Sequence, residues 1–203
     1  MRKHVIFQIL LIVSVLFFVK SVVGENEKKT WNIDVSHTKI LFTVKHMVIS
    51  SVTGDFKAFG GKVVSNGNDF TDAEFDVSIE VGSINTDSAK RDGHLKSDHF
   101  FDVANYPNIT FKSKSVKKVG EGVFKIVGDF TIHGVTKTEE LDMDFGGTIK
   151  DPWGNERAGL KIAGKINRFD YGLKWNDLLE TGGAMVGKSV DILCNTELVC
   201  RPK

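Results

Sequence analysis

Apolar and polar residues alternate with a period of two along most of the chain. The clearest case is residues 70–81, where Phe75, Val77, Ile79 and Val81 are separated by acidic and hydroxyl side chains. Successive side chains of a strand point to opposite faces, so this pattern predicts a strand with one apolar side and one water-facing side. Similar alternation predicts strands at residues 31–36, 109–116, 123–133, 135–149, 157–168 and 188–199.

Residues 37–63 predict a bent hairpin made of two longer strands. In the first arm Ile40, Phe42, Val44 and His46 share one face, and residues 51–63 form the second arm. Glycines at positions 54, 60 and 61 interrupt that second arm. Glycine inside a strand is typical of a bulge, a barrel corner or a close approach by another group. A bent hairpin with one apolar face predicts a sheet that closes on itself.

The alternation breaks at residues 86–102, which hold helix formers, few β-branched side chains, and a Thr or Asp suited to cap a helix. We therefore expect one helix inserted near residues 87–99. Eight or nine one-sided strands with short connections favour an all-β fold, and specifically an extended eight-stranded antiparallel barrel. A β-sandwich is the alternative architecture.

The N-terminus predicts a signal peptide at residues 1–24 and one domain at residues 25–203. A basic head is followed by an apolar run at residues 5–19, which Lys20 closes. A transmembrane anchor is the alternative, but the run is short for one. The formal net charge is +1, and removing the cations Arg2, Lys3 and Lys20 makes it −2. So small a net charge indicates neither nucleic acid nor an anionic membrane as partner.

Of the two cysteines, Cys194 falls in the last predicted strand and Cys200 directly follows it. On a continuous strand their Cα atoms lie roughly 20 Å apart, whereas a disulfide needs them within about 7 Å. Free thiols are therefore expected. A bridge made by a folded-back tail stays open, because exported proteins often pair their cysteines.

Several motifs in order carry a resemblance to a known family. They are residues 42–47 (FTVKHM), 51–56 (SVTGDF), 94–98 (HLKSD), 100–102 (FFD), 106–107 (YP), 109–112 (ITFK), 131–137 (TIHGVTK), 151–154 (DPWG), 166–168 (INR) and 175–176 (WN). From about residue 31 to 198 the chain resembles the YceI-like proteins, the polyisoprenoid-binding periplasmic family. The resemblance implies a lipocalin-like barrel that holds a long isoprenoid lipid, such as a polyprenyl quinone or polyprenyl phosphate. The cysteine-containing tail departs from the family pattern.

The inward face and the mouth of such a barrel supply the candidate ligand-binding residues. They are Phe42, Val44, His46, Phe56, Phe75, Val77, Ile79, Phe111, Phe130, Ile132, Leu141, Met143, Ile162, Arg168, Trp175 and Met185. The competing interpretation is that these side chains fill a solid core. Glycines at inward positions 128 and 164 favour empty space inside.

Polar and aromatic candidates for the head group gather near turns. Arg168 suits a phosphate or quinone oxygen, as does Arg91, for which a simple ion pair is the favoured role. His46 is either a satisfied core residue or a head-group contact. Trp153 and Trp175 either flank the mouth or pack.

The sequence predicts no catalysis, no metal and no cofactor other than the bound lipid. It contains no HExxH zinc motif and no GxSxG nucleophile elbow. We expect an exported carrier, periplasmic or secreted, with no nucleic-acid partner and no stable membrane span; a homodimer stays open. The alternatives are an enzyme of the export compartment acting on a small hydrophobic substrate, and a binder of other amphiphiles such as fatty acids.

Overall fold

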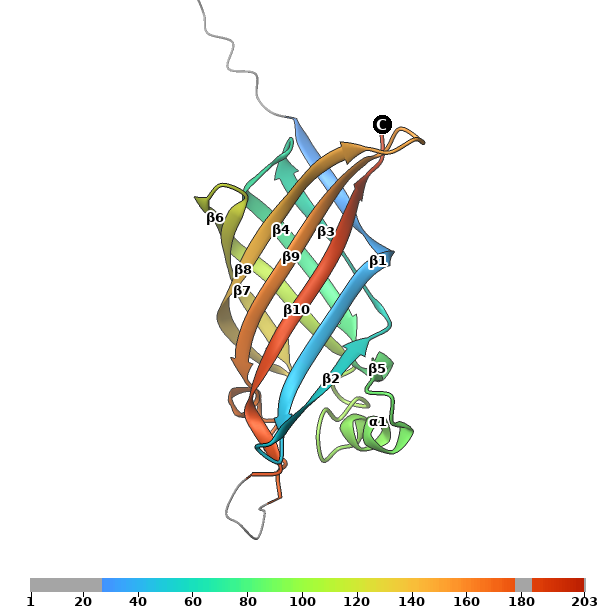
Figure 1. Cartoon of the computed structure of the whole chain (residues 1–203), viewed down its shortest axis with the longest axis vertical. Coiled ribbons are helices and arrows are strands. Elements are labelled where there is room, and N and C mark those ends of the chain that lie inside the picture. The colour runs from blue at the N-terminus through green and yellow to red at the C-terminus, as the bar shows by residue number, and fades with distance from the viewer. Residues whose placement is uncertain (1–26, 178–183, 203) are drawn as a thin grey trace, which may run out of the picture.

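The structure is a computed structural model that describes residues 27–177 and 184–202 (Figure 1). The predicted signal peptide, residues 1–24, lies outside the described residues, so it stays a prediction. Ten strands are present: β1 Lys28–His46, β2 Ser50–Phe56, β3 Phe59–Asn66, β4 Asp69–Glu80, β5 Ile84–Asn85, β6 Asn108–Gly120, β7 Val123–Ile132, β8 Val135–Lys150, β9 Glu156–Asn167 and β10 Val186–Cys200. The helices are α1 Ala89–Lys96 and two short 3₁₀ segments, η1 Val81–Ser83 and η2 Arg168–Tyr171.

The sheet closes into an antiparallel barrel because the first and last long strands pair. β1 pairs with β10 in a register that sets Ile40 opposite Cys194 and Val44 opposite Val190. β3 pairs with the first part of β1 and β2 with its last part, so β2 and β3 together occupy one strand position of the barrel. Counted this way the barrel has eight strands, as predicted. Closure leaves few free strand edges. It also turns the apolar side of each strand toward the interior of the barrel.

Two predicted boundaries in the hairpin are wrong. Residues 31–36 do not form a separate strand, because β1 runs on to His46 and absorbs the irregularity as a register shift between Asp34 and Lys39. The second arm divides into β2 and β3 at Lys57 and Ala58. The close approach expected at the glycines is present, since a Cβ on Gly61 would lie 2.4 Å from the carbonyl oxygen of Asp76 on β4.

The predicted helix is present, but it is shorter than expected. Its N-cap is Ser88, whose hydroxyl accepts a hydrogen bond from the Arg91 N–H at 3.5 Å, rather than the expected Thr or Asp. Thr86 instead donates to the carboxylate of Asp92 at 2.6 Å. α1 lies beside β2 and β5 at one end of the barrel (Figure 1). Among the residues that the structure describes, every helix is too short or too polar to cross a bilayer.

The barrel half farther from α1, which we call the packed half, is filled with side chains. Its buried members include Trp31, Val63, Phe70, Val116, Phe124, Ile126, Met143 and Leu198. Tilted aromatic pairs link Trp31 to Phe70 and Phe70 to Phe145, with ring centroids 5.7 and 5.1 Å apart. The Trp31 indole N–H donates to the Ser65 hydroxyl at 2.8 Å, so the one polar atom of that ring is satisfied.

The expectation that the inward glycines leave empty space is wrong. The ring of Phe111 covers Gly128 so closely that a Cβ there would lie 2.5 Å from Phe111 Cζ. Leu141 covers Gly164 in the same way, at 2.3 Å. Each glycine is where a larger neighbour packs against the backbone, and these neighbours help to fill the packed half.

Both cysteines are free, as expected from their spacing along β10. Burial raises the pKa of the Cys194 thiol to about 12, so this thiol stays protonated at neutral pH.

Candidate ligand-binding site

The other half of the barrel, on the α1 side, encloses a cavity of about 260 Å³. We call it the cavity half. β1, β2, β7, β9 and β10 provide most of the wall, and the α1 segment covers the remaining side. The cavity reaches the surface at Lys45 and Arg91, whose side chains are exposed. Most lining side chains are aliphatic or aromatic, so an apolar ligand would meet a dry surface.

Ten of the sixteen predicted ligand-binding residues line this cavity. They are Phe42, Val44, His46, Phe56, Ile79, Phe130, Ile132, Arg168, Trp175 and Met185. The other six lie outside it. Phe75, Phe111, Leu141 and Met143 are buried core residues, and Val77 and Ile162 pack against that core. Contact of these six with a ligand stays a prediction.

Two groups of lining residues were missed by the sequence reasoning. Val190 and Ile192 alternate on β10 with polar residues, so the period-two rule could have found them. Leu95, Phe100 and Phe101 come from α1 and the turn after it. No periodicity marks these three, because only the tertiary fold brings the α1 segment against the cavity.

Arg168 is 2% exposed and forms part of the cavity wall. Its guanidinium donates to the carbonyl oxygens of Leu173, of Trp175 at 2.9 Å, of Gly187 at 2.9 Å and of Val186 at 3.1 Å. Burial lowers its pKa from the usual value, and no carboxylate is bonded to it in the described part of the chain. Arg168 therefore ties the residues that follow β9 to the start of β10 and places a positive charge beside the cavity.

The other polar candidates lie around the same opening. His46 lines the cavity from the end of β1. His94 lines it from α1 and packs edge-on against Trp175, with centroids 4.6 Å apart. Arg91 does not form the expected ion pair in the described chain; it donates to the hydroxyl of Thr86 at 2.7 Å and to the Thr86 carbonyl at 2.6 Å.

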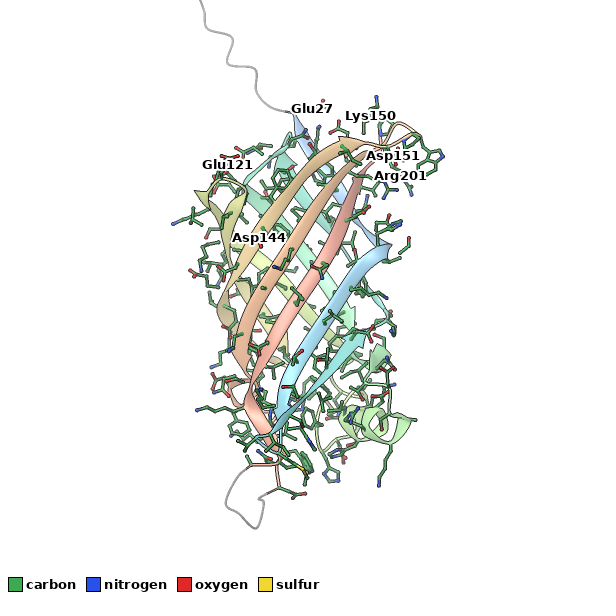
Figure 2. The ribbon with its side chains drawn as sticks, in the orientation of Figure 1. Glu27, Glu121, Asp144, Lys150, Asp151 and Arg201 are labelled. Carbon is green, nitrogen blue, oxygen red and sulfur yellow. The ribbon has the colours of Figure 1, made fainter. Side chains whose placement is uncertain are left out.

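The two tryptophans considered for the mouth, Trp153 and Trp175, lie at opposite ends of the barrel. Trp175 lines the cavity, but Trp153 lies 79% exposed in the turn between β8 and β9, at the opposite end of the barrel. That end carries many charges: Glu27, Glu121, Lys150, Asp151 and Arg201 all gather there in Figure 2. The opening of the cavity therefore lies at the end remote from these charges.

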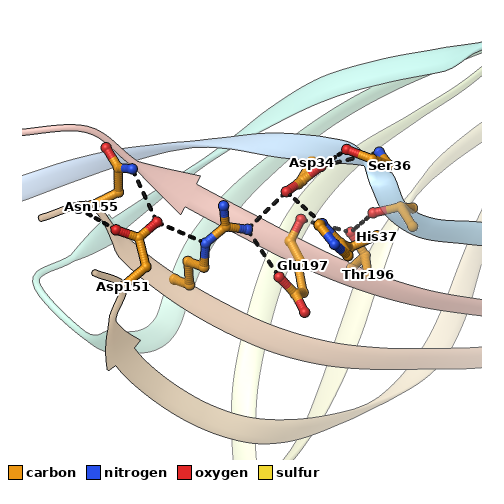
Figure 3. A network of polar contacts seen from close by, with 9 residues as sticks. Asp34, Ser36, His37, Asp151, Asn155, Thr196 and Glu197 are labelled. Atoms are coloured by element: carbon orange, nitrogen blue, oxygen red, sulfur yellow. Dashed lines mark hydrogen bonds and ion pairs between the residues drawn. The ribbon is translucent and has the colours of Figure 1, made fainter. Parts of the chain in front are cut away.

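A polar network at that charged end is the second cluster of titratable groups (Figure 3). Arg157 donates to Asp34 at 2.8 Å, Asp151 at 2.9 Å and Glu197 at 3.0 Å. Hydrogen bonds from Ser36, His37 and Arg157 hold the pKa of Asp34 well below its usual range. Although burial acts to raise it, hydrogen bonds from Asn155 and Arg157 lower the pKa of Asp151 to about 2.

Ligand atoms of Asp34, His37 and Glu197 in this network lie within 4.8 Å of one another, a spacing that could hold a metal ion. The guanidinium of Arg157 already bridges the two carboxylates, and a metal cation would compete with that positive charge. We therefore assign the network a structural role: it fixes the β1 irregularity against β9 and β10.

Comparison with known proteins decides the family. The model of the YceI-like domain matches residues 31–198. The chain belongs to the YceI-like family. A UPF0312 protein of Staphylococcus aureus is 40% identical over 165 residues, which are 81% of this chain and 94% of that protein. The family resemblance predicted from the motifs is thereby confirmed.

Solved structures agree with the fold of this family. The Campylobacter jejuni YceI protein is 31% identical, with a TM-score of 0.66 over 78% of this chain and 90% of its own. Burkholderia cenocepacia BcnA is 19% identical, with a TM-score of 0.70 over 81% of this chain and 98% of its own. A polyisoprenoid-binding domain from Saccharophagus degradans is 16% identical, with a TM-score of 0.63 over 84% of this chain and 98% of its own.

Proposed function

We propose that this YceI-like protein binds the apolar chain of an isoprenoid lipid in its cavity half and carries it without chemical change. The observation that carries the proposal is the 260 Å³ cavity, closed by strands on most sides and lined by side chains such as Phe42, Phe130 and Ile192. The polyisoprenoid-binding domain from Saccharophagus degradans has the same fold, which supports this ligand class. Transfer of each CH₂ from water to such a surface contributes roughly 0.8 kcal/mol.

The polar lining residues favour an anionic or oxygen-rich head group. They are Lys45, His46, Thr86, Arg91, His94 and Arg168. Within the described residues no carboxylate lines the cavity, so the wall offers donors and positive charge. This supports a polyprenyl phosphate, or the carbonyl oxygens of a polyprenyl quinone, near the opening.

The cavity volume limits how much of the ligand is enclosed. If each carbon group takes up roughly 30 Å³, about the volume of one water molecule, a chain of forty carbons occupies about 1,200 Å³. The cavity is smaller than this and open to the surface, so the remainder of a long tail would lie outside the opening or in space made by the packed half. The same apolar lining would accept a second candidate ligand, a single-chain amphiphile such as a fatty acid, whose shorter chain leaves less outside the cavity.

Export follows from the predicted signal peptide and is part of the proposal. The carrier would then act in the periplasm or outside the cell, where a lipid with a long apolar tail needs a protein to cross water. The function we propose needs no metal, no nucleic acid and no catalytic residue.

Lipid extraction of the purified protein, followed by mass spectrometry, tests the proposal directly. We expect an isoprenoid lipid at up to one molecule per chain. Titration with farnesyl phosphate, octaprenyl phosphate and palmitate then ranks the chains by length and type. Recovery of no lipid, together with no binding of any of the three, would overturn the proposal; preference for palmitate would select the second candidate.

A cavity-filling variant links binding to this cavity. Val190→Phe places a ring in the space that Val190 now borders, and we expect affinity to fall at least about tenfold. Val119→Phe is the matched control, because Val119 is 58% exposed on β6 and lies outside the cavity lining. Equal affinity in the two variants would place the ligand elsewhere.

A further inference from the structure

The turn between β1 and β2 exposes three consecutive apolar side chains, which we call the apolar turn. Met47 is 38% exposed, Val48 70% and Ile49 87%. Other strongly exposed apolar residues, such as Trp153 and Ile149, are separated by charged Lys150 and Asp151. The apolar turn differs because the chain contains no acidic residue from Lys39 to Gly54.

The backbone of the apolar turn is unusual for its residues. Six non-glycine residues of the described chain have positive φ, and four of them are Asp72, Asp87, Asp102 and His133, of types that tolerate this conformation. The other two are Met47, with φ of 51°, and Val48, with φ of 66°. Gly, Asn or Asp would relieve this strain in a hairpin turn. A strained, exposed, β-branched residue indicates a role outside turn stability.

The apolar turn stands at the opening of the cavity. Lys45 and His46, the two residues before it, both line the cavity. The Met47 N–H donates to the carbonyl oxygen of Met185 at 2.8 Å, and Met185 also lines the cavity. The turn is therefore fixed to the rim through which a ligand would enter.

Cations flank the apolar turn. Lys45 is exposed, and its side chain packs at Gly187, where a Cβ would lie 3.1 Å from Lys45 Cβ. The next residue on β10 is Lys188, which is also exposed. The net charge of the whole protein is close to zero, so any attraction of this end for anions comes from these nearby cations and acts only over a short distance.

We propose that the apolar turn inserts into an anionic lipid surface, with Lys45 and Lys188 at the level of the head groups. Apolar side chains between cations are the composition that binds the interface of a bilayer. Docking in this orientation would present the cavity opening to the lipid. The transfer of ligand between membrane and cavity rests on the proposed function, but docking itself does not.

Sedimentation with vesicles tests the docking. The full chain is mixed with vesicles of phosphatidylcholine alone or with about one third phosphatidylglycerol. We expect binding to the anionic vesicles that falls as salt rises, because Lys45 and Lys188 act through screened charge. In the variant Val48→Asn with Ile49→Ser we expect about tenfold weaker vesicle binding, because the inserted apolar area is lost.

The matched control is Ile149→Ser with Trp153→Ser, which removes exposed apolar area from the opposite end of the barrel. We expect this control to bind vesicles as the parent protein does. The double variant Val48→Asn with Ile49→Ser is expected to unfold at or above the midpoint temperature of the parent protein, because Asn tolerates positive φ. A lost vesicle interaction in a stable protein therefore cannot be attributed to misfolding.

Three results would overturn the docking proposal: no vesicle binding by the parent protein, equal binding by both double variants, or a concentration-dependent dimer that disappears only in the turn variant. The dimer would show that the apolar turn contacts a second copy of the chain. Ligand titration in vesicle-free solution is measured in parallel. If no ligand binds in that titration while vesicle binding still depends on the apolar turn, the proposed function is rejected and the docking proposal stands.

Discussion

The two halves of this barrel share strands, register and alternation, yet one is solid and the other is hollow. β7 shows the difference within ten residues: Phe124 and Ile126 are buried in the packed half, whereas Phe130 and Ile132 line the cavity. Between them Gly128 is covered by the ring of Phe111. The period-two pattern therefore fixes which face points inward, and the sizes of facing side chains decide whether the interior is filled.

The largest expected effect comes from removing the boundary between the halves. Phe111 packs edge-on against Phe130, with ring centroids 5.8 Å apart, so Phe111→Ala should extend the cavity into the packed half. We expect a loss of about 3–5 kcal/mol in the free energy of unfolding. We also expect octaprenyl phosphate to gain affinity relative to farnesyl phosphate. Denaturant unfolding and ligand titration measure the two effects.

Phe111→Leu is the control for that experiment, because it keeps most of the side-chain volume. An unchanged ratio of the two affinities in Phe111→Ala would show that the packed half does not limit chain length.

A second pair of variants compares the halves directly. Met143 is 0% exposed in the packed half, and Met143→Ala should lower the free energy of unfolding by about 2–5 kcal/mol. Val190 borders the cavity, where packing is already incomplete, so Val190→Ala should cost roughly 1 kcal/mol or less. Urea denaturation of both variants provides the measurement. Similar losses would contradict the distinction between the halves.

Glycine substitutions sharpen the same comparison with a smaller effect. A Cβ at Gly128 would meet the Phe111 ring at 2.5 Å and the Lys112 carbonyl oxygen at 2.6 Å. Since the backbone cannot yield as a side chain can, Gly128→Ala should cost about 1–3 kcal/mol. Gly60→Ala is the control, because a Cβ there would meet no other part of the chain within 4 Å and alanine restricts the unfolded chain. Thermal unfolding should separate the two variants.

The smallest expected effect is acid sensitivity of the charged end of the packed half, where Asp151 lies. The pKa of Asp151 is about 2 in the folded protein against an ordinary value of 3.8, so the charged form is favoured by folding. Its contribution is fully present above about pH 4 and is lost as the pH falls from there through 2. Asp151→Asn should therefore reduce the fall in stability between pH 4 and 2. Urea midpoints across this range measure it.

Glu121→Gln is the control for the pH series, because the Glu121 side chain is 96% exposed in the turn between β6 and β7. Parallel pH profiles for Asp151→Asn and the parent protein would show that Asp151 is not held in its charged form by Arg157 and Asn155.

Much of the fold was predictable because one-sided strands and short connections are local signals. The pattern gave the barrel, the inserted helix and the inward positions of Phe42, Val44 and Phe130. It could not give the split between β2 and β3, because Lys57 and Ala58 continue the alternation while the backbone bends.

The candidate site was predictable only in part. Ten lining residues followed from alternation and motifs, but Leu95, Phe100 and Phe101 depend on where the α1 segment packs. Gly128 and Gly164 were misread because a missing side chain looks the same in sequence whether a cavity or a neighbouring ring takes its place. Those neighbours, Phe111 and Leu141, lie on different strands from the glycines that they cover.

The seam between β1 and β10 has a consequence for how the protein is made. Asn32 pairs with Lys62 on one side and with Val199 on the other, so β1 gains β2 and β3 early but remains without β10 until almost the whole chain has been synthesised. Contacts between such distant residues carry a large loop-closure cost and form slowly. The nascent sheet would therefore keep one open edge along β1, and its apolar face would stay in contact with water, until β10 is complete.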